Sequence, residues 1–137
     1  MLHLIKLCVG AQDVDDLHRW QQGRMRALRE ATITHHTRQT PKRRADILAG
    51  GSLYWVIGGL VLVRQRILDI RDEPDDEGRP KCGLVLAPEL IAVAPQPRRP
   101  FQGWRYLTPE DAPADLGAAG AAMPAGMQRE LAALGLL

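Results

Sequence analysis

Basic side chains that could bind phosphate occur in three separate segments of this chain. Residues 38–44 hold one group, Arg64 and Arg66 lie two apart within an apolar run, and RRPFQGWRY (98–106) holds the third. Because alternate residues of a strand face the same side, roughly 6–7 Å apart, Arg64 and Arg66 could contact neighbouring phosphates. The candidate nucleic-acid-binding residues are therefore Arg38, Lys42, Arg43, Arg44, Arg64, Arg66, Arg98, Arg99, Trp104 and Arg105.

The third segment mixes arginines with aromatic rings, which is typical of surfaces that bind single-stranded nucleic acid. Bases stack on rings such as that of Trp104, while guanidinium groups pair with phosphates. Two alternatives stay open. Phe101, Trp104 and Tyr106 could anchor the segment to the core. The strand arginines could pair with carboxylates such as Asp69 or Asp72.

Charge is distributed unevenly along the sequence, although the net charge is only +2. Residues 1–67 hold 11 Lys and Arg against 5 Asp and Glu, whereas residues 68–137 hold 7 against 11. The first half therefore carries +6 and the second half −4. This asymmetry favours a basic face that attracts phosphate, and a well-solvated surface of paired charges is the alternative.

A small enzyme or an anion-metabolite binder is the second hypothesis. The same arginines would then line a pocket and hold a phosphorylated or carboxylated metabolite, with His35 or His36 as the general base. A deep pocket with arginines and a histidine would favour this hypothesis, whereas a broad basic groove would favour nucleic acid. Ser52 is the only serine, and the start of a strand after Gly50-Gly51 explains it more simply than a nucleophile does.

No metal or cofactor site is predicted. The adjacent histidines have no cysteine or acidic ligand at metal spacing, and Cys8 and Cys82 lack a CxxC pattern, so both are expected to be buried thiols. Glycine-rich phosphate loops and the hydrolase motifs GxSxG and HExxH are absent. The sequence therefore indicates no named reaction.

Apolar runs bounded by glycine or proline predict the strands that would position these side chains. Gly58 and Gly59 predict a tight hairpin between two of the runs. Residues 32–40 are predicted to be a polar connection. The predicted strands cover residues 2–9, 52–57, 60–70, 82–86, 90–94 and 102–107.

Helices are predicted between some of these strands. Asp13 is a suitable N-cap for a helix over residues 13–30, whose apolar stripe places Trp20 in the core. A short helix follows over residues 41–48, and TPED (108–111) is the start signal of a third. The expected fold is α+β, with a curved mixed or barrel-like sheet of five or six strands and two or three packed helices.

The length of 137 residues suits a single domain, which we expect over residues 1–116. Residues 117–137 are predicted to form an Ala/Gly-rich linker and a short C-terminal helix, whose leucine face could hold a homodimer together. No signal peptide and no run of about 20 apolar residues is present, so we expect a cytoplasmic protein without a membrane partner.

Four strings along the chain resemble a bacterial family of small proteins that is defined as a domain of unknown function. They are HLIKLCVG (3–10), GGSLYWVI (50–57), VRQRI (63–67) and RPFQGWRYLTPEDAPADL (99–116). This resemblance implies no activity. A looser resemblance links the glycine-turned hairpin and the long basic strand to PUA-like and ASCH-type small β-barrels, which implies RNA as the nucleic acid.

Overall fold

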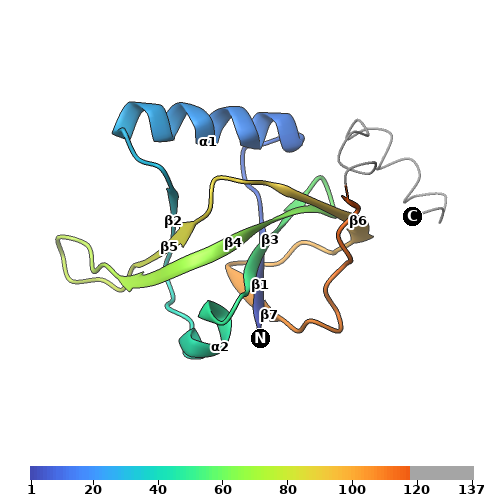
Figure 1. The fold of residues 1–137 in the computed structure, drawn as a ribbon. Helices are drawn as coiled ribbons and strands as arrows, with labels where there is room; N and C mark the ends of the chain where they lie inside the picture. The colour runs from blue at the N-terminus through green and yellow to red at the C-terminus, as the bar shows by residue number, and fades with distance from the viewer. Residues whose placement is uncertain (118–137) are drawn as a thin grey trace.

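The computed structural model describes residues 1–117, which form two helices and seven strands (Figure 1). The helices are α1 (Val14–Leu28) and α2 (Arg44–Leu48). The strands are β1 (His3–Leu7), β2 (Ile33–Thr37), β3 (Ser52–Ile57), β4 (Leu60–Asp72), β5 (Cys82–Leu86), β6 (Ile91–Pro97) and β7 (Trp104–Leu107).

All seven strands belong to one open, mixed sheet. Its order is β2-β5-β4-β3-β1-β7, and β6 pairs separately with β4. β1 and β3 run parallel, whereas the other pairs are antiparallel. The predicted α+β class and mixed sheet are confirmed. The sheet has seven strands rather than five or six, and it is open rather than barrel-like.

The long strand β4 connects the parts of the sheet. Gly58 and Gly59 both have positive φ, of 60° and 83°, as a tight hairpin turn from β3 requires. The first half of β4 then pairs with β3 on one side and β6 on the other, and the second half pairs with β5. Register shifts interrupt these pairings, and such irregularities bend a strand.

The strand β2 was not expected, because residues 32–40 were predicted to be a polar connection. It is an edge strand that pairs with β5 alone, from Ile33 opposite Leu86 to Thr37 opposite Cys82. An edge strand can keep polar side chains toward solvent, so ITHHT lacks the alternation that marks other strands. Its β-branched residues were the available signal.

The helix α1 begins as predicted, with the Asp13 side chain accepting from the backbone N–H of Asp16 at 2.8 Å. The helix α2 is shorter than predicted, because residues 41–43 precede it without helical structure. The third helix start gives only a turn at residues 109–111. The helix and linker predicted beyond residue 117 lie outside the described residues, so their structure and the boundary at residue 116 stay predictions.

The two faces of the sheet carry separate apolar clusters. The larger cluster includes Leu17 and Met25 of α1 and Ile47 of α2, so both helices pack on the same face. In Figure 1, α1 crosses one end of the sheet and α2 lies near the other. The smaller cluster, around Ile5 and Val61, occupies the opposite face. No helix in residues 1–117 is long and apolar enough to span a membrane.

Candidate ligand pocket

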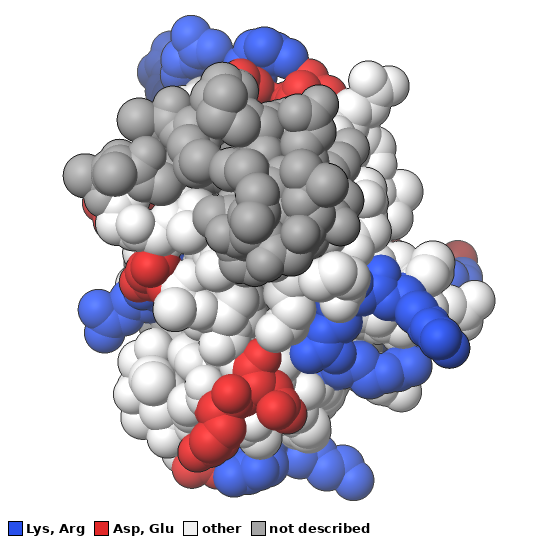
Figure 2. All heavy atoms as spheres, turned by 90° about the vertical axis from the view of Figure 1, so that its right-hand side faces the viewer, with Lys and Arg blue, Asp and Glu red and all other residues white. Residues whose placement is uncertain are grey.

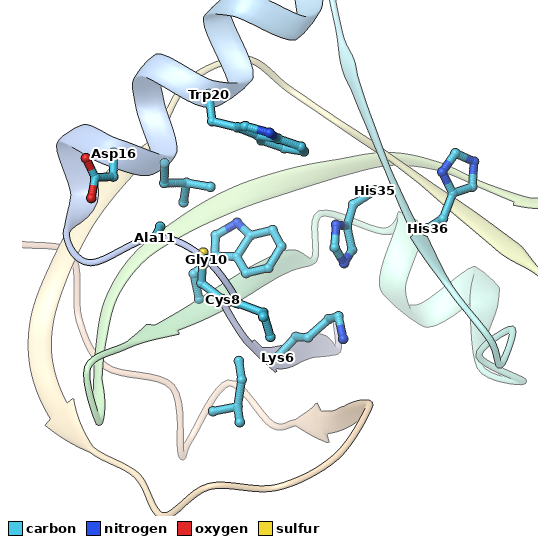
Figure 3. Close-up of a pocket in the computed structure, with 12 residues that line it drawn as sticks. Lys6, Cys8, Gly10, Ala11, Asp16, Trp20, His35 and His36 are labelled. Atoms are coloured by element: carbon cyan, nitrogen blue, oxygen red, sulfur yellow. The ribbon is translucent and has the colours of Figure 1, made fainter.

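A cavity of about 380 Å³ opens between α1 and the sheet (Figure 3). We call it the α1 pocket. Its walls come from the end of β1 and the following loop, from the first half of α1, and from β2 and β3. The lining residues are Lys6, Leu7, Cys8, Val9, Gly10, Ala11, Asp16, Leu17, Trp20, His35, His36 and Trp55.

His35 has an unsatisfied polar atom at this cavity. Its Nε2 is buried and has no hydrogen-bond partner among the described residues. The ring stands edge-on against Trp55, with 5.0 Å between ring centroids. Burial, helped by the charge of Lys6, lowers the pKa of His35 from 6.5 to about 4, so the ring is neutral at pH 7. A buried polar atom without a partner costs about 1–3 kcal/mol, and a ligand could remove that cost.

Lys6 lies within the sheet, with a tryptophan on each side. In the register of the sheet, Lys6 lies opposite Trp55 on β3 and opposite Trp104 on β7. Paired residues share a face, and neighbouring strands are about 4.8 Å apart, so the three side chains form one row. Burial lowers the pKa of Lys6. Its ammonium has no carboxylate partner within residues 1–117.

A buried amide network holds Trp55 in place. Its Nε1–H donates to Oε1 of Gln65 at 2.8 Å. Gln65 and Gln21 exchange two further hydrogen bonds, of 2.9 and 2.8 Å, which connect β4 to α1. The remaining Gln65 N–H donates to the carbonyl of Ala87 at 3.0 Å. The indole N–H is therefore satisfied away from the cavity, and Trp55 offers the pocket an apolar ring.

Trp20 lies at the rim of the pocket and not in the core, so the sequence-based placement was wrong. The buried side of α1 runs through Leu17, Gln21 and Met25, at intervals of four residues. Trp20 precedes Gln21, which turns it about 100° from that line. It is 54% exposed, and the Arg24 guanidinium lies 5.7 Å from its ring centroid. Figure 3 shows its ring above the cavity.

The other polar side chains of the pocket are Asp16 and His36, which already have partners, and the Cys8 thiol. The Asp16 carboxylate pairs with Arg19. His36 Nε2 lies 2.9 Å from Oε2 of Glu73, so that nitrogen already has a carboxylate partner. Burial raises the pKa of the Cys8 thiol, so it stays protonated at neutral pH and is a poor nucleophile. The arrangement therefore suits binding better than thiol chemistry.

Arg64, a residue of the predicted phosphate surface, already donates a hydrogen bond from each of its three guanidinium nitrogens. Its Nε and Nη2 donate to the two carboxylate oxygens of Asp115 at 2.8 and 2.7 Å, and Nη1 donates to Ser52 Oγ at 2.9 Å. Hydrogen bonding to Arg64 lowers the pKa of Asp115. This bidentate pair fastens the segment after β7 to β4. Arg66 is exposed and has no ion-pair partner in the described part of the chain.

The structure does bring the segment 38–44 against β7. Trp104 Nε1–H donates to the carbonyl of Gln39 at 2.9 Å, and Tyr106 Oη accepts from the backbone N–H groups of Lys42 and Arg43 at 3.0 and 3.3 Å. Part of the charge is paired. Arg43 contacts Asp46 at 3.0 Å, and Arg44 contacts Asp69 at 2.8 Å.

The remaining predicted residues lie elsewhere. Arg105 faces the opposite side of β7 from Trp104 and lies 5.5 Å from the Phe101 ring centroid. The backbone of Arg98 bonds to Gly59 at the hairpin, which places Arg98 and Arg99 beside the β3–β4 turn. Figure 2 shows Lys and Arg side chains on one face in several groups, with acidic groups between them. The ten predicted residues thus do not share one surface, and their role stays a prediction.

Sequence reasoning missed Lys6, Trp55 and Trp20 as site residues. A lysine inside the apolar strand HLIKL was a signal, because a buried ammonium needs a partner. The contribution of Trp55 depends on pairing between β1 and β3, which local pattern does not reveal. His35 was considered as a general base, but its low pKa and its place beside Lys6 appear only in the fold.

A protein-family model matches most of the chain. Residues 4–137 match the family described as "Protein of unknown function (DUF1489)". The chain belongs to this family. The predicted membership in a family of unknown function is confirmed, and it assigns no activity. Curated proteins and solved structures gave no match. Within residues 1–117, no three His, Cys, Asp or Glu side chains are grouped so that they could hold a metal ion.

Proposed function

We propose that this DUF1489 protein binds a small organic ligand in the α1 pocket. The observation that carries the proposal is the buried, unpartnered Nε2 of His35 at a cavity lined by Trp20, Trp55 and Lys6. Ligand pockets are typically apolar and aromatic, with a few convergent polar groups that fix orientation. The proposal keeps the metabolite-binding hypothesis that was made from the sequence, but Lys6 and not the arginines supplies the positive charge of the pocket.

A thermal-shift screen of small organic compounds tests this proposal. Ligands of the pocket should raise the melting temperature of the wild-type protein, because a ligand that binds the folded state stabilises it. The same compounds should stabilise a His35→Phe variant much less. His18→Phe on the exposed side of α1 is the matched control and should respond like the wild type. Hits that stabilise all three proteins equally would place the binding site elsewhere.

Nucleic acid, RNA in particular, is the second candidate ligand. The observation that favours it is the contact of Tyr106 with Lys42 and Arg43, which joins basic and aromatic residues on one surface. Arg38 and Lys42 are exposed and have no ion-pair partner among residues 1–117. The resemblance to PUA-like domains supports the same ligand class, although the sheet is open.

Binding to short single-stranded RNA across a salt series tests the second candidate. Affinity should fall as salt rises, and an Arg38→Ala/Lys42→Ala variant should bind more weakly with a smaller salt slope. Arg79→Ala/Lys81→Ala removes the same charge from the loop between β4 and β5 and is the control. Equal loss in both variants would mean nonspecific attraction, and no binding at low salt would exclude this candidate.

Two further properties belong to this proposal. We also propose a cytoplasmic location, which stays an expectation from the sequence. A homodimer held by the predicted C-terminal helix would be disrupted by Leu131→Asp and Leu134→Asp together, which analytical ultracentrifugation of the full chain would detect as a change in mass.

A further inference from the structure

We propose that the α1 pocket takes a planar aromatic carboxylate, with its ring against the tryptophans and its acid group on Lys6. This inference rests on the small-ligand function proposed above and names the chemical class of the ligand. It is carried by the row that Lys6 forms with Trp55 and Trp104, and by the position of His35 beside that row.

Trp55 presents ring surface and not its N–H group to a ligand. The Trp55 Nε1–H is bound to Gln65, whereas Trp104 flanks Lys6 in the sheet without lining the pocket. Trp20 comes from α1 on the other side of the cavity (Figure 3). Flat rings stack or pack edge-to-face on such surfaces and gain about 0.5–1.5 kcal/mol beyond simple burial. A planar ligand fits between a wall on the sheet and a ring on the helix.

Lys6 sets the charge of the ligand. Lys6 is the one lysine among the residues that line the pocket. The residue is half-buried, and its ammonium has no counter-ion within residues 1–117. One ammonium matches one negative charge, as in a carboxylate. A phosphate monoester carries about −1.5 to −2 at pH 7 and would also meet the Asp16 carboxylate at the pocket wall. The pocket therefore favours a carboxylate over a phosphate.

His35 provides a second contact for the same acid group. The charge of Lys6 acts on the His35 ring, and Figure 3 shows the Lys6 side chain extending toward that ring. A neutral imidazole has one N–H, which can donate to a carboxylate oxygen while Lys6 binds the other. This pair of contacts would satisfy the nitrogen that has no partner in the described structure.

The size of the cavity limits the ring system. Pockets for small molecules range from roughly 300 to 1,000 Å³, and this cavity, at about 380 Å³, lies near the lower limit. A compound with one or two rings fits such a space, whereas a dinucleotide does not.

Calorimetric titration with paired probes tests the inference. The probes are benzoate, 2-naphthoate and indole-3-carboxylate, each with its neutral amide. At least one acid should bind the wild-type protein about tenfold or more tightly than its amide. Lys6→Met keeps the length of the side chain and removes its charge, so it should abolish that preference. Lys81→Met, in the exposed loop before β5, should preserve it.

Each result distinguishes the two proposals. Equal binding of acid and amide, unaffected by Lys6→Met, would overturn the carboxylate inference and leave the small-ligand function intact. No binding by any of the six probes would overturn the inference, while the thermal-shift screen would still decide the function. If Lys6→Met does not fold, the acid-to-amide ratio of the wild-type protein alone decides the inference.

Discussion

At the scale of single residues, His35 makes stability depend on pH. Between pH 6.5 and about 4, the unfolded imidazole binds a proton and the folded one does not, so acid favours unfolding in this window. A shift from 6.5 to about 4 corresponds to about 3 kcal/mol. We expect chemical denaturation of the wild type to lose about that much more free energy on acidification than a His35→Phe variant.

The comparison needs a control at another histidine. His18 is exposed on α1, so His18→Phe should lose as much free energy of unfolding in acid as the wild type does. His3 also has a lowered pKa, mainly through burial, but it is present in every variant and cancels from the difference. Parallel pH profiles for wild type and His35→Phe would show that His35 is not buried in its neutral form.

Arg64 and Arg66 differ in role although they lie two residues apart. Removing Arg64 leaves Asp115 and Ser52 without their donor, so Arg64→Ala should lower the free energy of unfolding by about 2 kcal/mol. Arg66→Ala should change it by less than about 0.5 kcal/mol, because the side chain is exposed. Urea denaturation of the two variants measures this difference, and equal stabilities would contradict a structural role for Arg64.

Acid should weaken the same ion pair. Hydrogen bonding to Arg64 lowers the pKa of Asp115 below its ordinary value of 3.8. Its stabilising effect is therefore fully present above that value and is lost as pH falls through the lowered pKa. Asp115→Asn should remove this low-pH component, in a range below the one governed by His35.

At the scale of elements, the contact between α1 and the sheet depends on an exchange of amide hydrogen bonds. Gln65→Met would leave the Trp55 N–H, the Gln21 amide and the Ala87 carbonyl without partners. We expect a loss of about 3 kcal/mol in the free energy of unfolding. Gln21→Met/Gln65→Met should cost less than the sum of the two single changes, because each removes the other's partner.

Gln22→Met is the control for this prediction, since Gln22 neighbours Gln21 on α1 and has no side-chain hydrogen bond in the described structure. A loss for Gln65→Met no larger than that of Gln22→Met would show that the network does not hold the helix. Because Trp55 is a wall of the α1 pocket, Gln65→Met should also weaken ligand binding, whereas Gln22→Met should not.

At the scale of the whole molecule, the sequence predicts continuous elements better than it predicts their pairing. β3 and β5 have the predicted bounds, because each is an apolar run bounded by glycine or a turn. β2 was missed because an edge strand does not need apolar side chains. The partner of Arg64 lies 51 residues along the chain, so its role could not be read from local pattern.

The residues of the candidate site were also harder to predict where they depend on pairing between distant strands. Lys6 was visible as a charge in an apolar strand, but its two tryptophan neighbours come from β3 and β7, which follow 49 and 98 residues later in the chain. Trp20 was placed in the core because its helical stripe passes close to the buried line of α1. Neighbouring residues of a helix point about 100° apart, which is enough to separate the buried Gln21 from the exposed Trp20. The apolar pattern of the sequence does not show which of the two faces the core.

The central claim is that the α1 pocket is a ligand site. A crystal of the full chain soaked with a library of small aromatic fragments tests it most directly. We expect fragments to occupy the space between Trp20 and Trp55, with acidic fragments placing an oxygen within hydrogen-bond distance of Lys6 and of His35. An empty pocket in crystals where fragments bind elsewhere on the surface would contradict the claim.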